Sequence, residues 1–113
     1  MLKAEQISNE LKVIWDLDDG VVRDPAEFAA LTALSPGFSP KQASYYFLGE
    51  RRAPLVEWKA LIASLQPLLE QRVKLRFICT SQKIAGWLKE MGVALLGEIA
   101  CDPVAKEKAG KIS

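Results

Sequence analysis

Two groups of polar side chains in this sequence are of types and spacings that could do chemistry. The first is the pair Asp16 and Asp18, which follows the β-prone run 13–15. Paired carboxylates after such a run can hold Mg²⁺ or attack a phosphoryl group. The second group is suited to contacting phosphates and base edges. It comprises Lys41, Gln42, Ser44, Tyr45, Arg51 and Arg52.

Composition limits the chemistry that these groups can support. The 113 residues include no histidine, which excludes Ser-His-Asp catalysis and His-ligated zinc. The net charge is +1, so binding to nucleic acid would depend on a local basic patch. Cys79 and Cys101 do not form a CxxC pair, and we expect buried, reduced thiols. The length fits one domain, 1–113.

Neither a membrane segment nor a signal peptide is expected. Residues 1–10 are polar and lack the apolar stretch of a secretory signal. No apolar run is long enough to cross a bilayer. The sequence therefore predicts a cytoplasmic protein with no membrane partner.

Two segments carry the same signal for the start of a helix. Asp24-Pro25-Ala26-Glu27 has an N-cap, a proline at the first helical position and an acid that closes a capping box. Ser39-Pro40-Lys41-Gln42 repeats this arrangement. We therefore predict a helix from 24 to about 32 and a second from 39 to about 48, with Gly49 as its C-cap.

The remaining elements follow from hydrophobic spacing. The pattern predicts a helix through Trp58 and Leu65, a strand over 73–79, a helix from Ser81 and a strand over 93–99. A polar tail follows over 102–113. Residues 11–17 fit either a helix or a strand, and the two functional interpretations divide on that choice.

The capped pair resembles the helix-turn-helix of phage- and plasmid-type regulators. Residues 25–31 resemble the first helix of that motif, and 42–52 resemble the second helix and its exit. The turn 34–39 is longer than is usual in that family. The resemblance implies a transcriptional regulator that binds double-stranded DNA as a homodimer. On this interpretation bases are contacted by Lys41, Gln42, Ser44 and Tyr45, and phosphates by Arg51 and Arg52.

The segments 13–22 and 77–81 also resemble the first two motifs of haloacid-dehalogenase-like phosphatases. That resemblance implies a three-layer α/β fold and a Mg²⁺ cofactor. It makes Asp16 the nucleophile and metal ligand, Asp18 the acid–base residue and metal ligand, and Thr80 a phosphate-binding residue. Lys106 or Lys108 would stand for the lysine of the third motif, and only Asp102 is available for the acidic fourth motif.

A third interpretation is a small dimeric protein-interaction module. Its interface would be the strand–helix–strand region 73–99, with Trp87 or Met91 exposed. Our first choice is an α+β domain, and the sequence leaves open whether it is an enzyme. It has a helix-turn-helix region at 24–54, a strand–helix–strand region at 73–99 and a tail at 102–113, and its function is sequence-specific DNA binding.

Overall fold

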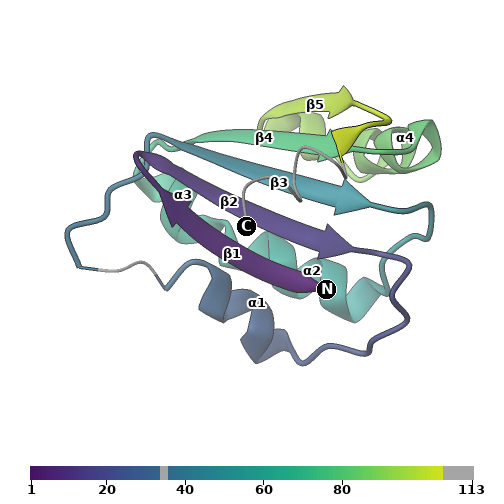
Figure 1. Cartoon of the computed structure of the whole chain (residues 1–113), viewed down its shortest axis with the longest axis horizontal. Coiled ribbons are helices and arrows are strands. Elements are labelled where there is room, and N and C mark those ends of the chain that lie inside the picture. The colour runs from purple at the N-terminus through teal and green to yellow at the C-terminus, as the bar shows by residue number, and fades with distance from the viewer. Residues whose placement is uncertain (34–35, 106–113) are drawn as a thin grey trace.

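The computed structural model, which describes residues 1–33 and 36–105, is built around one five-stranded sheet (Figure 1). The strand order is β1-β2-β3-β4-β5, so the order in space is the order in the chain. β1 is antiparallel to β2, and the other neighbouring pairs are parallel. The strands are β1 (Leu2–Ile7), β2 (Glu10–Asp16), β3 (Gln42–Leu48), β4 (Lys74–Cys79) and β5 (Glu98–Cys101).

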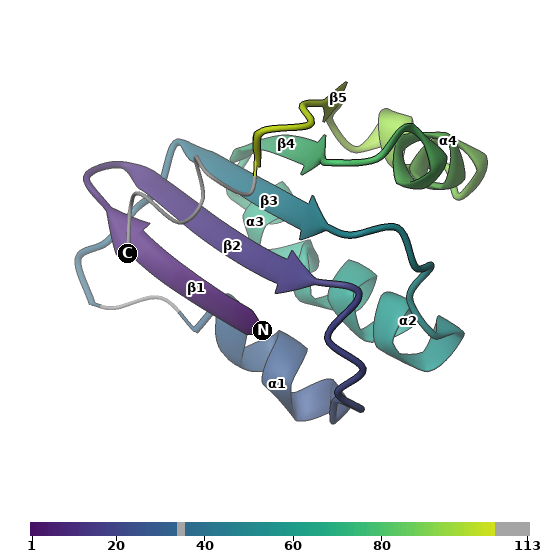
Figure 2. The ribbon, with the colours of Figure 1, turned by 45° about the vertical axis from the view of Figure 1, so that its right-hand side comes forward.

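The helices connect the parallel strands and cover one face of the sheet (Figure 2). Crossovers between parallel strands are almost always right-handed, so strands added in one direction place every crossover helix on the same face. None of the helices in the described ranges is long and apolar enough to span a bilayer. They are α1 (Pro25–Leu31), α2 (Leu55–Ser64), α3 (Gln66–Glu70), α4 (Gln82–Glu90) and the short 3₁₀ helix η1 (Val93–Leu95).

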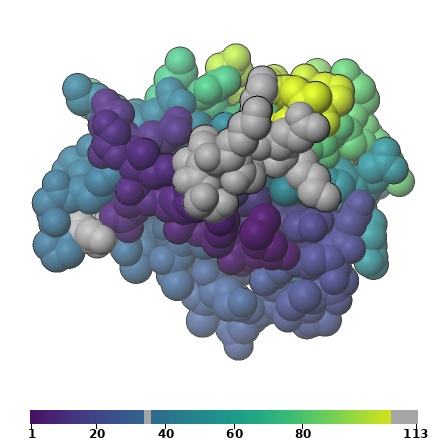
Figure 3. Space-filling view, in the orientation of Figure 1, coloured from purple at the N-terminus to yellow at the C-terminus, as the bar shows by residue number. Residues whose placement is uncertain are grey.

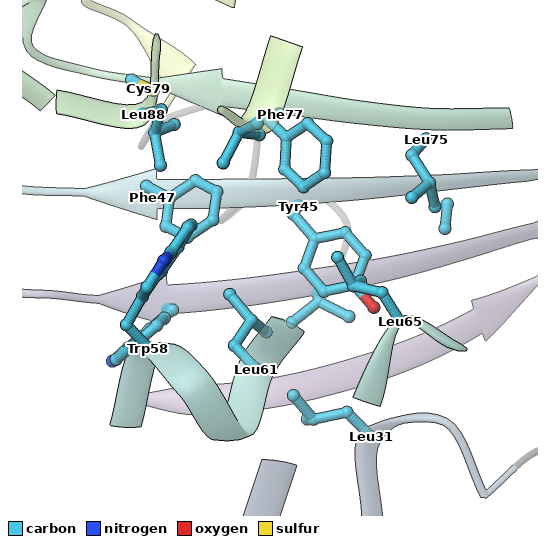
Figure 4. Packing of buried hydrophobic residues seen from close by; sticks show 14 of the residues in the cluster. Leu31, Tyr45, Phe47, Trp58, Leu61, Leu65, Leu75, Phe77, Cys79 and Leu88 are labelled. Carbon is cyan, nitrogen blue, oxygen red and sulfur yellow. The ribbon is translucent and has the colours of Figure 1, made fainter. Parts of the chain in front are cut away.

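The main hydrophobic core lies between this sheet face and the helices. Alternate residues of β3, among them Tyr45 and Phe47, point into it. Trp58 and Leu61 of α2 point towards these rings (Figure 4). On the other face of the sheet, Ile14 of β2 and Leu48 of β3 form a second small cluster, against which Tyr46 packs. Strands buried on both faces explain why 11–17 reads as a nearly continuous apolar run.

The predicted helix over 39–48 is wrong, and with it the helix-turn-helix. Residues 42–48 form β3, in the middle of the sheet and parallel to both neighbours. Aromatic residues at 45–47 favour a pleated strand, where successive side chains reach opposite faces. Gln42 does not close a capping box, because its side-chain amide donates to Glu10 across the sheet at 2.7 Å. The local start signal was outweighed by the burial of both faces.

Most other predicted elements are confirmed, with changes at the ends of the chain. The capping box of α1 is present, with both reciprocal contacts between Asp24 and Glu27. The helix through Trp58, the strand over 73–79 and the helix after Ser81 are α2, β4 and α4. The predicted strand 93–99 is divided between η1 and β5. Polar β1 was not predicted, because it is an edge strand with no fully buried residue.

The domain thus mixes helices and strands as predicted, but in a different arrangement. Residues 11–16 are strand, in the same direction as β4 but separated from it by β3. The helices of the described part cover a single face, so it has two layers rather than the three of the phosphatase-like alternative. The turn 34–39 and the tail 102–113 fall partly, and Lys106 and Lys108 wholly, outside the described residues.

Tyr45 offers a first test of this packing. Its ring is 1% exposed, and its hydroxyl has no hydrogen-bond partner among the described residues. Burial also raises the pKa of this hydroxyl. Because an unpaired buried hydroxyl is destabilising, we expect Tyr45→Phe to raise the free energy of unfolding by roughly 0.5–2 kcal/mol. Urea denaturation followed by circular dichroism would measure the change.

Tyr46 is the matched control, since it lies next in sequence on the opposite face and is only partly buried. The variant Tyr46→Phe removes only the hydroxyl. It keeps the ring, whose centroid lies 4.9 Å from the Lys12 ammonium nitrogen. We expect no gain in stability from that change. A loss of stability in Tyr45→Phe would contradict the conclusion that the Tyr45 hydroxyl is buried without a hydrogen-bond partner among the described residues.

Candidate functional site at the carboxyl ends of the parallel strands

Three loops leave the parallel strands at the same edge of the sheet. They are the β2–α1 loop (17–24), the β3–α2 loop (49–54) and the start of the β4–α4 connection at Thr80. The first two lie together on the right-hand side of the molecule in Figures 1 and 3. Side chains from different strands meet at this edge in parallel α/β sheets, and it is where ligands usually bind.

Asp18 holds the β3–α2 loop in place. Its carboxylate accepts hydrogen bonds from the backbone N–H of Glu50, 3.1 Å from each oxygen, and from that of Arg51 at 2.9 Å. The N–H of Gly49 in turn donates to the Thr80 hydroxyl at 3.0 Å. The N–H of Asp18 donates to Asp16 Oδ1 at 3.0 Å, and this hydrogen bond holds the backbone of Asp18 in position. The two loops and Thr80 therefore form one connected unit.

Gly49 is the residue that this arrangement requires. Its φ of +98° lies in the region that favours glycine. A Cβ atom at this position would be 2.5 Å from Asp18 Cγ and within 2.8 Å of both carboxylate oxygens. The sequence correctly singled out Gly49 but predicted it as the C-cap of a helix. In the structure it follows a strand, and glycine is needed there because the Asp18 carboxylate comes so close.

Asp19 organises the other half of the β2–α1 loop. Its carboxylate pairs with the guanidinium of Arg23 and with the amino group of Met1. It also accepts from the N–H of Val21 at 2.9 Å. Burial and the neighbouring Arg23 lower the pKa of the Met1 amino group. These contacts fix the loop between β2 and the first turn of α1.

A cavity of about 140 Å³ lies between the two loops. Trp15 of β2 and Leu17 of the β2–α1 loop line it, and Glu57 lines it from the first turn of α2. Glu57 is buried, and none of the described residues forms a hydrogen bond or ion pair with its carboxylate. The N-terminal end of a helix favours an acid at this position.

Exposed apolar side chains and two arginines lie on the two loops that line the cavity and on the first turn of α2, which follows the second loop. Val22 is 89% exposed, Val56 66% and Leu55 57%. Arg51 and Arg52 are exposed, and within residues 1–33 and 36–105 neither guanidinium has an ion-pair partner. We call these five residues together with Val21 the edge surface. A groove of about 480 Å³ adjoins the edge surface at Leu55 and runs between α2 and η1.

The residues predicted to bind DNA are not brought together. Lys41 precedes β3, whereas Arg51 and Arg52 lie beyond its other end. Ser44 is buried, its hydroxyl donates to Glu10 at 3.0 Å, and it accepts from the Gln42 amide at 3.2 Å. Tyr45 is buried in the main core. The predicted base-contacting set therefore presents no common surface.

The residues of the phosphatase-like alternative do meet at one edge, but their polar atoms have other partners. Both oxygens of Asp18 accept backbone N–H groups, and the Thr80 hydroxyl accepts another. Amide donors occupy the lone pairs that a cation would need. Among the residues that the structure describes, no group of three or more acidic or thiol side chains could hold a metal ion. Asp16 and Asp18 do not fit a Mg²⁺ site.

Known proteins supply no further guide to the site. No protein family matches the chain, and neither the curated proteins nor the solved structures contain a significant match. The edge surface was not predicted from the sequence. One signal for it was present, because Val56 lies outside the apolar stripe formed by Trp58, Leu61 and Leu65.

Proposed function

We propose that this chain is a protein-interaction module that binds another protein through the edge surface. The observation that carries the proposal is the exposure of Val22 on the β2–α1 loop and of Leu55 and Val56 on the first turn of α2, directly after a loop that Asp18 holds by hydrogen bonds. Exposed apolar side chains that are grouped together mark interaction sites more often than isolated ones do. A partner would bury them with little change in loop conformation.

The charges of the edge surface indicate the chemistry of the partner. Arg51 and Arg52 flank the apolar side chains and have no acidic partner within the described part of the chain. Arginine is favoured at interfaces because it forms bidentate pairs with carboxylates. We therefore expect the partner to present apolar side chains flanked by aspartate or glutamate.

This surface supports a protein partner better than it supports DNA. Arginines would bind phosphate, but a phosphate backbone offers no apolar contact for Val22, Leu55 and Val56. The interface at 73–99 that the sequence suggested is less well supported, because Trp87 is 7% exposed and packs in the core. Only Met91 of that pair is exposed.

Site-specific photocrosslinking in the native cell tests the proposal. A benzophenone amino acid at Val56 should give one discrete protein adduct, whereas the same amino acid at Ile7 should not. Ile7 is a matched control because it is 40% exposed at the opposite end of the sheet. The partner identified by mass spectrometry would then be purified and its affinity measured by calorimetry.

The decisive comparison uses variants of the edge surface with that purified partner. Charge reversal at Arg51 and Arg52 to glutamate should weaken binding tenfold or more and reduce its dependence on salt. Ile7→Asp should leave the affinity unchanged. Equal adducts at the two positions, an adduct formed only with a second copy of the chain, or a mobility shift on DNA without a protein adduct would each contradict the proposal.

A further inference from the structure

Cys79 and Cys101 lie side by side on neighbouring strands. They are register partners in the parallel pair β4 and β5. Both side chains are on the helix-covered face, where Cys101 packs against the core cluster that contains Cys79. The N–H of Asp102 donates to the Cys79 carbonyl at 2.7 Å, so the pairing extends one residue past the two cysteines.

The separation of paired strands suits a disulfide. Neighbouring strands lie about 4.7–4.9 Å apart, and the Cα atoms of a disulfide are usually about 4.4–6.8 Å apart. Both thiols are free in this structure. The spacing of paired strands therefore allows a disulfide between the two cysteines without a change in strand pairing.

The two thiols differ in their access to solvent. Cys79 is fully buried, and burial together with the nearby Cys101 raises its pKa to about 12. Cys101 is only partly buried and belongs to β5, which is the last strand of the sheet. Because Cys101 is the more accessible of the two thiols, a small oxidant in solution will reach it first.

We propose that Cys101 and Cys79 form an oxidation site at which a peroxide generates an intramolecular disulfide. The Cys101 sulfur attacks one peroxide oxygen, so that an S–O bond forms and the O–O bond breaks. The sulfur is oxidised by two electrons to a sulfenic acid, and the other oxygen leaves as water with the thiol proton. The Cys79 sulfur then attacks the Cys101 sulfur, the S–O bond breaks, and the hydroxyl leaves as water with the Cys79 proton.

The disulfide would close a loop that carries α4 and η1 and would fix the edge strand β5 to β4. It would restrict the unfolded chain more than the folded one, so we expect a rise in Tm of about 5 °C or more. This inference is independent of the proposed protein-binding function, because neither cysteine belongs to the edge surface.

The test treats the full folded chain with hydrogen peroxide and then blocks the remaining thiols with N-ethylmaleimide. Intact-mass spectrometry should show the loss of two hydrogens and no added maleimide. Peptide mapping should identify a Cys79–Cys101 link that a phosphine reductant reverses. The link should form at least tenfold faster in the folded protein than in the same chain in denaturant, where the two cysteines are no longer held together.

Two variants separate the steps. Cys79→Ala should stop the reaction at a Cys101 sulfenic acid that dimedone traps, and Cys101→Ser should leave Cys79 unoxidised. Labelling of both thiols after peroxide treatment would overturn the proposal. So would oxidation of Cys101 to a sulfinic acid without a link, a disulfide only between two molecules, or equal rates in the folded and denatured chains.

Discussion

Gly49→Ala is expected to lower the free energy of unfolding by about 2–5 kcal/mol. The methyl group would be strained at a φ of +98° and would meet the Asp18 carboxylate at 2.5 Å from Cγ. A side chain in the left-handed region costs roughly 1–2 kcal/mol, and forced overpacking costs about 1–3 kcal/mol more. Asp18 cannot move away without releasing the N–H groups of Glu50 and Arg51. Urea denaturation would measure the loss.

Gly92→Ala is the matched control for Gly49. Gly92 also has a positive φ, of +80°, but a Cβ atom there would have no neighbour within 4 Å. Its replacement should therefore show the conformational cost alone, about 1–2 kcal/mol. If the two variants lost equal stability, the close approach of Asp18 to Gly49 would not exist in solution. Asp18→Ala combined with Gly49→Ala should lose less than the sum of the single changes.

Phe77→Ala should lower the free energy of unfolding by about 3–5 kcal/mol. Phe77 is fully buried on β4, with its ring centroid 5.8 Å from that of Tyr45 and 6.3 Å from that of Phe47. Deleting the ring leaves a cavity between the sheet and the helices, where the other rings cannot collapse to fill it. Domains of this size are stable by about 5–15 kcal/mol, so the variant would be close to unfolding.

Phe38 provides the comparison for Phe77, because it packs against the same cluster but is only partly buried. Phe38→Ala should cost clearly less, since part of its ring is already in contact with water. Both losses would be measured by thermal and urea denaturation. A cost for Phe77→Ala no greater than that for Phe38→Ala would contradict the full burial of Phe77 in the core.

The two capping signals show how far local sequence determined the fold. Asp24 to Glu27 begins a helix whose buried side chains, Phe28 and Leu31, need only one face. Ser39 to Gln42 carries the same signal, yet the residues that follow are buried alternately on two faces. Over so short a segment, Ala43, Tyr46 and Phe47 fit one face of a helix, whereas Ala43, Tyr45 and Phe47 fit one face of a strand. Contacts with β2 and β4, which are distant in sequence, decided between them.

The candidate site was harder to predict than the fold. The phosphatase-like alternative placed Asp16, Asp18 and Thr80 at or just after the ends of strands, and the structure brings them to one edge. Their roles could not be predicted, because the contact of Asp18 with the β3–α2 loop joins residues more than 30 positions apart. An aspartate in a loop looks the same in sequence whether it binds a metal ion or backbone N–H groups. The exposure of Val22 likewise depends on the packing of the loops around it.

The consecutive order of the strands has a consequence for how the chain acquires its structure during synthesis. Each strand pairs with the one that precedes it, from β1 to β5. A chain emerging from the ribosome can therefore add each new strand to an edge that already exists, without opening a pair that has formed. Because each partner is the next strand along the chain, every pairing closes a shorter loop than a non-consecutive order would require, and this lowers the entropy cost of closure. Among the described strands, β5 is the one added last to this growing edge.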